Sequence, residues 1–243
     1  ISALPPALPM DVTQAIVRGA AEKALEAGVV IAGGHSIKDE EPKFGLVALG
    51  IVQNHQLLTK SGARPGDRLF LSKPLGTGVI TTALKRSFTS PDELEDAVTW
   101  MKRLNRDAAL LAVDFGLHAA TDITGFGLLG HATEMAEASG VALRFHFPRI
   151  PLMKAARKFA DAYTFPGGAA DNQLYFSPNV TVQGELSENL LTLLYDPQTS
   201  GGLLIAVPEE KAAQFQAEAD ARAIPMWQIG SVTSGSGITI LAE

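Results

Sequence analysis

The chain has 243 residues, of which 46% are hydrophobic and 19% charged, with no cysteine and a formal net charge of −6. This length and composition suffice for one large core or two ordinary ones. The acidic balance argues against binding to nucleic acid or to a membrane surface, since either would need a basic face. The absence of cysteine excludes thiol chemistry, and no apolar run reaches the roughly 18 residues that a bilayer requires. We expect a cytoplasmic protein.

Residues 1–60 predict an incomplete sheet domain. Apolar residues at helical spacing predict a helix at 11–27. Short apolar runs predict a buried strand at 29–32 and a second strand at 44–52. The polar turn Gly33-Gly34-His35-Ser36 follows the first of these strands, at the kind of carboxyl edge where α/β folds often bind ligands.

Residues 61–243 predict a complete, layered α/β domain, so the fold class is α+β with layered α/β character. Strands are predicted at 68–73, 118–122, 141–147, 203–207, 227–233 and 238–242. Helices are predicted at 76–85, 92–115 (one helix, or two with a break), 128–138, 151–162, 187–194 and 209–223. The last two strands flank Ser234-Gly235-Ser236-Gly237, which predicts a hairpin.

The segment Thr121-Asp122-Ile123-Thr124-Gly125-Phe126-Gly127-Leu128 places one carboxylate before a glycine-rich turn that opens into a helix. Glycines let the backbone approach a ligand, a helix start near Leu128 offers N–H groups to an anion, and Asp122 is a candidate Mg²⁺ ligand. The pattern is typical of a metal-bound phosphate site. The alternative is a turn whose glycines serve packing and whose Asp122 caps the helix. His131, on the same helix, is assigned a packing or capping role.

The run Asp196-Pro197-Gln198-Thr199-Ser200-Gly201-Gly202 precedes the predicted strand at 203–207. Its N–H groups could bind an anion, or the run could be a tight turn that feeds a buried strand, and the sequence leaves both open. The sequence does not support several other kinds of nucleotide, catalytic or metal site. There is no P-loop, Rossmann or nucleophile-elbow signature, and His55, His118 and His146 lack the spacing of zinc ligands.

The motifs at 33–36, 121–128 and 196–202 occur in the order in which they are found in selenophosphate synthetases (selenide, water dikinases). The chain resembles this family over nearly its whole length. The likeness includes Lys73-Pro74-Leu75-Gly76-Thr77-Gly78, and Pro166-Gly167-Gly168 followed by Asn172. The resemblance implies the aminoimidazole ribonucleotide synthetase type of fold, with the C-terminal part of an N-terminal ATP-binding domain at 1–60 and a complete α/β domain at 61–243. It also implies the conversion of ATP, hydrogen selenide and water to selenophosphate, AMP and phosphate.

The resemblance implies roles for four residues: Gly33, Gly34 and His35 contact the ATP, and Asp122 binds Mg²⁺. It implies a homodimer that pairs through its N-terminal domains. The family's catalytic Cys or selenocysteine and its Lys lie upstream of the position of Ile1. We therefore assign no catalytic residue and expect a truncated chain that is inactive alone. The alternatives are a sister enzyme, such as thiamine-monophosphate kinase, aminoimidazole ribonucleotide synthetase or a hydrogenase-maturation dehydratase, and a non-catalytic nucleotide-binding paralogue.

Overall fold

The structure, a computed structural model, describes residues 1–243. The chain forms two compact units, residues 1–52 and 53–243, which are described separately. The domain assignment at 1–60 and 61–243 stays a prediction. None of the helices is long and apolar enough to cross a membrane.

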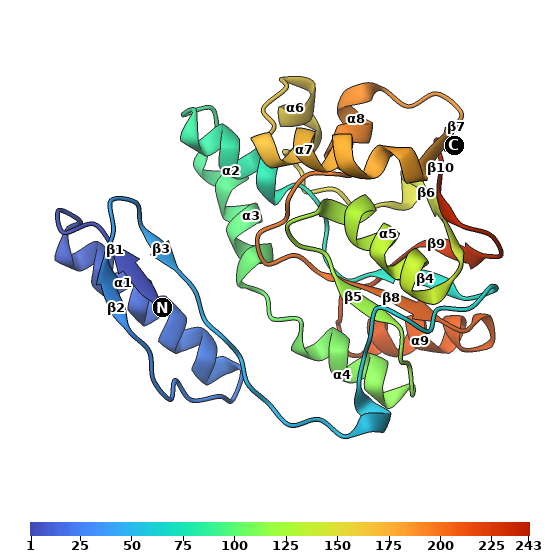
Figure 1. Ribbon diagram of the computed structural model, residues 1–243, viewed down its shortest axis with the longest axis horizontal. Coiled ribbons are helices and arrows are strands. Elements are labelled where there is room, and N and C mark those ends of the chain that lie inside the picture. The colour runs from blue at the N-terminus through green and yellow to red at the C-terminus, as the bar shows by residue number, and fades with distance from the viewer. The chain divides into compact units, whose positions relative to one another are not determined.

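The first unit is a small three-stranded sheet with one helix (Figure 1). Its elements are β1 (Ser2–Leu4), α1 (Met10–Glu26), β2 (Ser36–Lys38) and β3 (Lys43–Phe44). The central strand β1 pairs in parallel with β2 and antiparallel with β3. The helix predicted at 11–27 is confirmed as α1.

The two strands predicted in this unit are wrong in extent. Residues 29–35 form no strand, and of the segment predicted at 44–52 only Phe44 lies in a strand, as the last residue of β3. The side chain of Val30 is 86% exposed and that of Ile51 is fully exposed. A strand requires a neighbour for its N–H and C=O groups and an apolar layer for one face, and an apolar run in the sequence does not guarantee either.

The second unit is built on a seven-stranded mixed sheet with the order β5-β8-β4-β9-β6-β10-β7. The strands are β4 (Arg68–Leu71), β5 (Ala120–Asp122), β6 (Ala142–His146), β7 (Val180–Gln183), β8 (Leu203–Val207), β9 (Trp227–Thr233) and β10 (Gly237–Leu241). All six strands predicted here are present, and β7 was missed. This sheet confirms a mixed α/β fold.

The second unit contains eight α-helices. They are α2 (Thr77–Lys85), α3 (Pro91–Lys102), α4 (Arg106–Asp114), α5 (Gly127–Ser139), α6 (Ala156–Asp161), α7 (Gly167–Phe176), α8 (Glu188–Leu193) and α9 (Glu209–Ala221). Short 3₁₀ turns lie at Asn54–Gln56, Phe147–Arg149 and Ser177–Asn179. The stretch 92–115 breaks into α3 and α4, the helix predicted at 151–162 shortens to α6, and α7 was missed.

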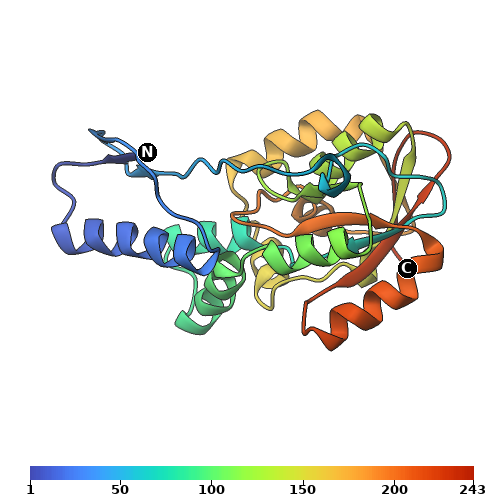
Figure 2. The same cartoon turned by 90° about the horizontal axis from the view of Figure 1, so that it is seen from below.

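Alternating side chains of β4 divide the core between the two faces of the sheet. Leu69 and Leu71 belong to the cluster that includes Leu128 of α5. Phe70 points to the opposite face, into the cluster that includes Leu111 of α4 and Phe215 of α9. Figure 2 shows α9, in dark orange, on one side of the sheet and α5, in yellow-green, on the other. The sheet is therefore buried on both faces.

The hairpin predicted for β9 and β10 is wrong, because β6 lies between them. Phe145 of β6 pairs with Gly230 of β9 on one side and with Ile240 of β10 on the other. The intervening β6 runs antiparallel to β9 and parallel to β10. Gly-Ser turn residues specify a reversal of the chain, but they do not determine which strand the returning segment pairs with.

Candidate functional site

Asp122 lies at the end of the edge strand β5, where the chain enters the glycine turn. Its backbone pairs with Leu203 of β8, and its side chain is exposed. One carboxylate oxygen, Oδ2, accepts a hydrogen bond from Thr124 Oγ1 at 3.2 Å, the only side-chain contact that the carboxylate makes. The sheet therefore fixes the backbone of Asp122 and leaves its carboxylate available for a ligand.

Asp122 lines a pocket of about 520 Å³ that lies wholly within the second unit. Lys60 and Arg106 bring two positive charges to the wall of this pocket, and Asn105 and Thr121 bring polar groups. The Lys60 ammonium is paired with a carboxylate of α5, whereas Arg106 forms no ion pair. A carboxylate flanked by cations is suited to an anion that carries a divalent metal.

The glycines of the turn serve packing more than ligand approach. Gly127 has φ of +68°, and a Cβ there would lie 2.6 Å from the carbonyl carbon of Tyr195. A Cβ at Gly130 would lie 2.5 Å from Phe126 Cβ. Only Gly125 faces open space, with nothing within 4 Å of an added Cβ. The packing alternative is thus correct for two of the three glycines, although Asp122 does not cap α5, whose N-cap makes no side-chain bond.

The start of α5 differs from the predicted anion site. The N–H of Phe126 donates to His131 Nε2, that of Gly127 to the carbonyl of Thr124, and that of Leu129 to the carbonyl of Leu194. These three donors are therefore occupied by the protein itself, so the start of α5 offers fewer free N–H groups to an anion than predicted.

The run Asp196–Gly202 packs against the glycine turn. The N–H of Gln198 donates to the carbonyl of Thr124 at 2.9 Å, and the N–H of Ile123 donates to the carbonyl of Gly202 at 2.8 Å. A Cβ at Gly201 would lie 1.9 Å from the carbonyl oxygen of Ile123, so a larger residue would separate the two loops. The structural reading of this run is favoured, because its backbone forms the support beneath Asp122.

Asp196 is fully buried and holds the start of α2. Its Oδ2 accepts hydrogen bonds from the N–H groups of Gly78 at 2.9 Å and Val79 at 3.2 Å, while Oδ1 has no partner. Burial raises the pKa of Asp196 to about 7. Asp196 therefore fixes the loop that follows β4 to the loop that supports the glycine turn.

Lys73 is buried at the same junction. Its ammonium donates to the backbone carbonyls of Arg103 at 2.6 Å and Ser200 at 2.7 Å, and it has no carboxylate partner. Burial, assisted by the nearby Arg103 charge, lowers the pKa of Lys73 to about 8. Lys73 thereby ties the break between α3 and α4 to the Asp196–Gly202 run.

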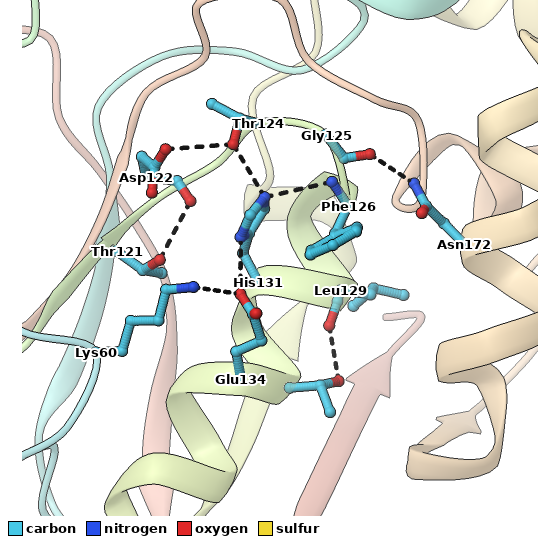
Figure 3. A network of polar contacts seen from close by, with 11 residues as sticks. Lys60, Thr121, Asp122, Thr124, Gly125, Phe126, Leu129, His131, Glu134 and Asn172 are labelled. Atoms are coloured by element: carbon cyan, nitrogen blue, oxygen red, sulfur yellow. Dashed lines mark hydrogen bonds and ion pairs between the residues drawn. The ribbon is translucent and has the colours of Figure 1, made fainter. Parts of the chain in front are cut away.

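The sequence analysis missed a polar network on α5 (Figure 3). His131 is buried, and its Nδ1 lies 3.1 Å from Glu134 Oε2, which also accepts from Lys60 Nζ at 2.6 Å. Its Nε2 lies 3.1 Å from Thr124 Oγ1. Burial lowers the pKa of His131, partly opposed by Glu134. The i, i+3 spacing of His131 and Glu134 on one helix face was a signal for this pair.

Gly33, Gly34 and His35 lie in the first unit and are exposed. The carbonyl of His35 accepts a hydrogen bond from the N–H of Ser2 at 3.0 Å, which joins the turn to β1. A Cβ at either glycine would meet nothing within 4 Å. The turn is thus open to a ligand, and its contact with ATP stays a prediction.

Comparison with known proteins identifies the family. Residues 64–243 match the model of the AIR synthase related protein, C-terminal domain. A selenide, water dikinase from Caldanaerobacter subterraneus subsp. tengcongensis is 48% identical over 210 residues, which are 86% of this chain and 61% of that protein. One from Carboxydothermus hydrogenoformans is 40% identical over 233 residues, 96% of this chain and 68% of that protein. The chain belongs to the selenide, water dikinase family.

Solved structures outside the selenide, water dikinases share the fold. Escherichia coli HypE, a hydrogenase maturation protein, superposes with a TM-score of 0.71 at 19% identity, covering 98% of this chain and 67% of HypE. Thiamine-monophosphate kinase from Stenotrophomonas maltophilia superposes with a TM-score of 0.69 at 17% identity, covering 98% and 69%. The chain itself spans about three fifths of the length of the first selenide, water dikinase, at 61%.

The donor set around Asp122 suits Mg²⁺. Hard oxygen ligands are those that Mg²⁺ prefers, and it usually retains several waters and shares substrate phosphates. The carboxylate of Asp122 and the hydroxyl of Thr124 are oxygen donors within 3.2 Å of each other. No group of three His, Cys, Asp or Glu side chains in residues 1–243 could hold a metal by itself. Within this chain, Asp122 thus offers a single carboxylate to a metal, and the pocket that it lines leaves room for phosphate oxygens and water.

Proposed function

We propose that this chain supplies the Asp122 site of an enzyme that makes selenophosphate from ATP, hydrogen selenide and water, releasing AMP and phosphate. Family membership supports the reaction, because relatives at 40–48% identity are named selenide, water dikinase. The observation in the structure that carries the proposal is the exposed carboxylate of Asp122 in a pocket with Lys60 and Arg106.

Each of these residues has a distinct part in the proposal. Asp122 would hold Mg²⁺, which would offset the charge of the ATP phosphates and so permit attack by a nucleophile. Arg106 is free to form charge-assisted hydrogen bonds with a phosphate. Lys60 is held by Glu134 at 2.6 Å and adds positive potential to the pocket wall. Gly33, Gly34 and His35 would contact the nucleotide from the first unit.

We also propose that the 243-residue chain does not form selenophosphate alone and that the enzyme is a homodimer. The chain contains no cysteine, so it cannot supply the Cys or selenocysteine that the family uses. Exposed apolar side chains gather in the first unit, with Val30 at 86%, Val47 at 84% and Leu49 at 94% exposure. In this proposal, the second subunit covers these apolar side chains.

Phosphorus NMR tests the reaction directly. The longest natural form of the protein is incubated anaerobically with ATP and Mg²⁺, with and without sodium selenide. We expect selenophosphate, AMP and phosphate that depend on selenide, and loss of this activity by at least a hundredfold in Asp122→Asn. Asp220→Asn, at the exposed end of α9, is the matched control and should retain activity. ADP as the main product would instead indicate a sister kinase, and nucleotide binding without turnover a non-catalytic paralogue.

A further inference from the structure

We infer that Thr124 and His131 position Asp122 for its cation. The Thr124 hydroxyl donates its hydrogen bond to Asp122 before the cation binds and turns to donate it to His131 afterwards. The inference rests on the metal role proposed for Asp122. It assigns Thr124 and His131 as positioning residues, whereas the sequence alone indicated a packing or capping role for His131 and no role of its own for Thr124.

The tautomer of His131 follows from its two neighbours (Figure 3). Nδ1 lies 3.1 Å from Glu134 Oε2, and a carboxylate oxygen can only accept, so Nδ1 carries the hydrogen. Glu134 Oε2 is fixed by Lys60 Nζ at 2.6 Å. On the other side of the ring, the N–H of Phe126 donates to Nε2 at 3.3 Å, so Nε2 is an acceptor. The imidazole is thereby set with its lone pair toward the glycine turn.

Thr124 stands between two acceptors and has one hydrogen to donate. Its Oγ1 lies 3.2 Å from Asp122 Oδ2 and 3.1 Å from His131 Nε2. Both distances are suitable for a hydrogen bond, and the hydroxyl can turn from one acceptor to the other without movement of the backbone. Two arrangements of the same heavy atoms are therefore available to this side chain.

Charge decides between the two arrangements. Without a cation, the carboxylate of Asp122 is the stronger acceptor, and the hydroxyl donates to it. When Asp122 holds a cation, the cation draws electron density from the carboxylate and makes Oδ2 a weaker acceptor than before. The hydroxyl then donates to His131 Nε2, where it shares the single lone pair of that nitrogen with the N–H of Phe126. Thr124 thus orients the free carboxylate of Asp122, and His131 keeps the Thr124 hydroxyl hydrogen-bonded once the cation is bound.

The ring of His131 is held firmly enough to serve as this acceptor. Its side chain is buried, and its centroid lies 5.2 Å from that of the Phe126 ring. Bonds at both nitrogens prevent the ring from flipping. Partners of this kind, one bond removed from the metal, typically alter metal affinity by about 10- to 100-fold when they are removed.

The test measures Mn²⁺ affinity, by the EPR signal of free Mn²⁺, in the full natural protein with a non-hydrolysable ATP analogue. Thr124→Val removes the hydroxyl while retaining the shape, and we expect about tenfold weaker Mn²⁺ binding. Thr124→Ser restores the hydroxyl and should bind within about twofold of wild type. His131→Phe should weaken binding as Thr124→Val does. The double variant should be no weaker than either single one, because both remove the same interaction.

The outcomes separate this inference from the function on which it rests. Normal Mn²⁺ binding by Asp122→Asn would refute the metal role of Asp122, and the positioning role with it. Weak binding by Asp122→Asn together with normal binding by Thr124→Val would refute the positioning role alone. Losses that multiply in the double variant, or failure of Thr124→Ser to restore binding, would indicate general disruption of the turn and would equally overturn the inference.

Discussion

Substitution of Gly127 by alanine should destabilise the second unit strongly. The backbone φ of +68° costs a residue with a Cβ about 1–2 kcal/mol. The added Cβ would lie 2.6 Å from the carbonyl carbon and 2.8 Å from the Cα of Tyr195, all backbone atoms that cannot rotate away. Overpacking of this kind costs about 1–3 kcal/mol. The two effects together predict a loss of about 2–5 kcal/mol in the free energy of unfolding.

Gly125→Ala is the matched control in the same turn. Gly125 has no positive φ, and an added Cβ would meet nothing within 4 Å. Surface substitutions without such conflicts usually change stability by less than about 0.5 kcal/mol. The pair therefore separates the effect of geometry from any general intolerance of the turn.

Urea unfolding followed by tryptophan fluorescence is the suitable assay. The chain contains two tryptophans, Trp100 and Trp227, and both lie in the second unit with ring centroids 6.0 Å apart. The signal thus reports on the unit that contains the turn. A Gly127→Ala protein within about 0.5 kcal/mol of wild type would refute the reasoning, and so would an equal loss in Gly125→Ala.

Three further experiments test individual interactions within the second unit. Burial raises the pKa of Asp196 from 3.8 to about 7, so its contribution to stability is full below pH 4 and is lost as the pH rises to about 7. Over this pH range, the urea concentration at the unfolding midpoint should fall more steeply for wild type than for Asp196→Asn. Equal slopes for the two proteins would contradict the burial argument. Asn172→Asp replaces an amide that donates to two backbone carbonyls at 2.8 and 3.0 Å, and thermal unfolding should show a loss of about 2–4 kcal/mol, whereas an unchanged melting temperature would mean that water replaces these bonds. Ser90→Ala removes a capping box that is closed by Glu93 and should lower the free energy of unfolding in urea by about 1 kcal/mol. Ser187→Ala is the control, because Ser187 is an N-cap with no side-chain bond. Equal losses at both positions would contradict the capping argument.

Local signals in the sequence predicted the helices of the second unit well. The sequence Ser90-Pro91-Asp92-Glu93 is typical of a helix start, and the structure shows both bonds of its capping box. Gly140 closely follows the helix predicted at 128–138, and it adopts the left-handed conformation at the end of α5. Caps and stops depend on residues within one turn of each other, which is why a sequence reveals them.

Strand pairing was predicted less well, because it depends on segments that lie far apart. The position of β6 between β9 and β10 brings Ala142 beside Thr233 and Gly237, and no residue of the Gly-Ser turn specifies that choice. The strands predicted at 29–32 and 44–52 failed for the same reason, since apolar composition does not supply a partner. The missed α7 has little amphipathic pattern, with Leu174 and Tyr175 exposed at 80% and 76%.

The candidate site was predicted in its central residue and missed in its surroundings. Asp122 stands at the end of a strand before a glycine turn, as its spacing predicted. The network behind it joins His131 to Glu134 within one helix, and Glu134 to Lys60, which is 74 residues distant in sequence. Folding creates that last contact, so no pattern in the sequence could indicate it.

The glycine turn and the Asp196–Gly202 run have to be understood as one structural unit. The carbonyl of Thr124 accepts from the N–H groups of both Gly127 and Gln198, so the same peptide is fixed from within the turn and from the supporting run. Gln198 Oε1 in turn accepts from the N–H of Gly76 at 2.9 Å. A change at Gln198 would therefore displace the backbone of Thr124. Since the Thr124 hydroxyl donates to Asp122, the carboxylate of Asp122 would be displaced as well. The Asp196–Gly202 run thus holds the peptide of Thr124, whose side chain contacts the candidate ligand Asp122.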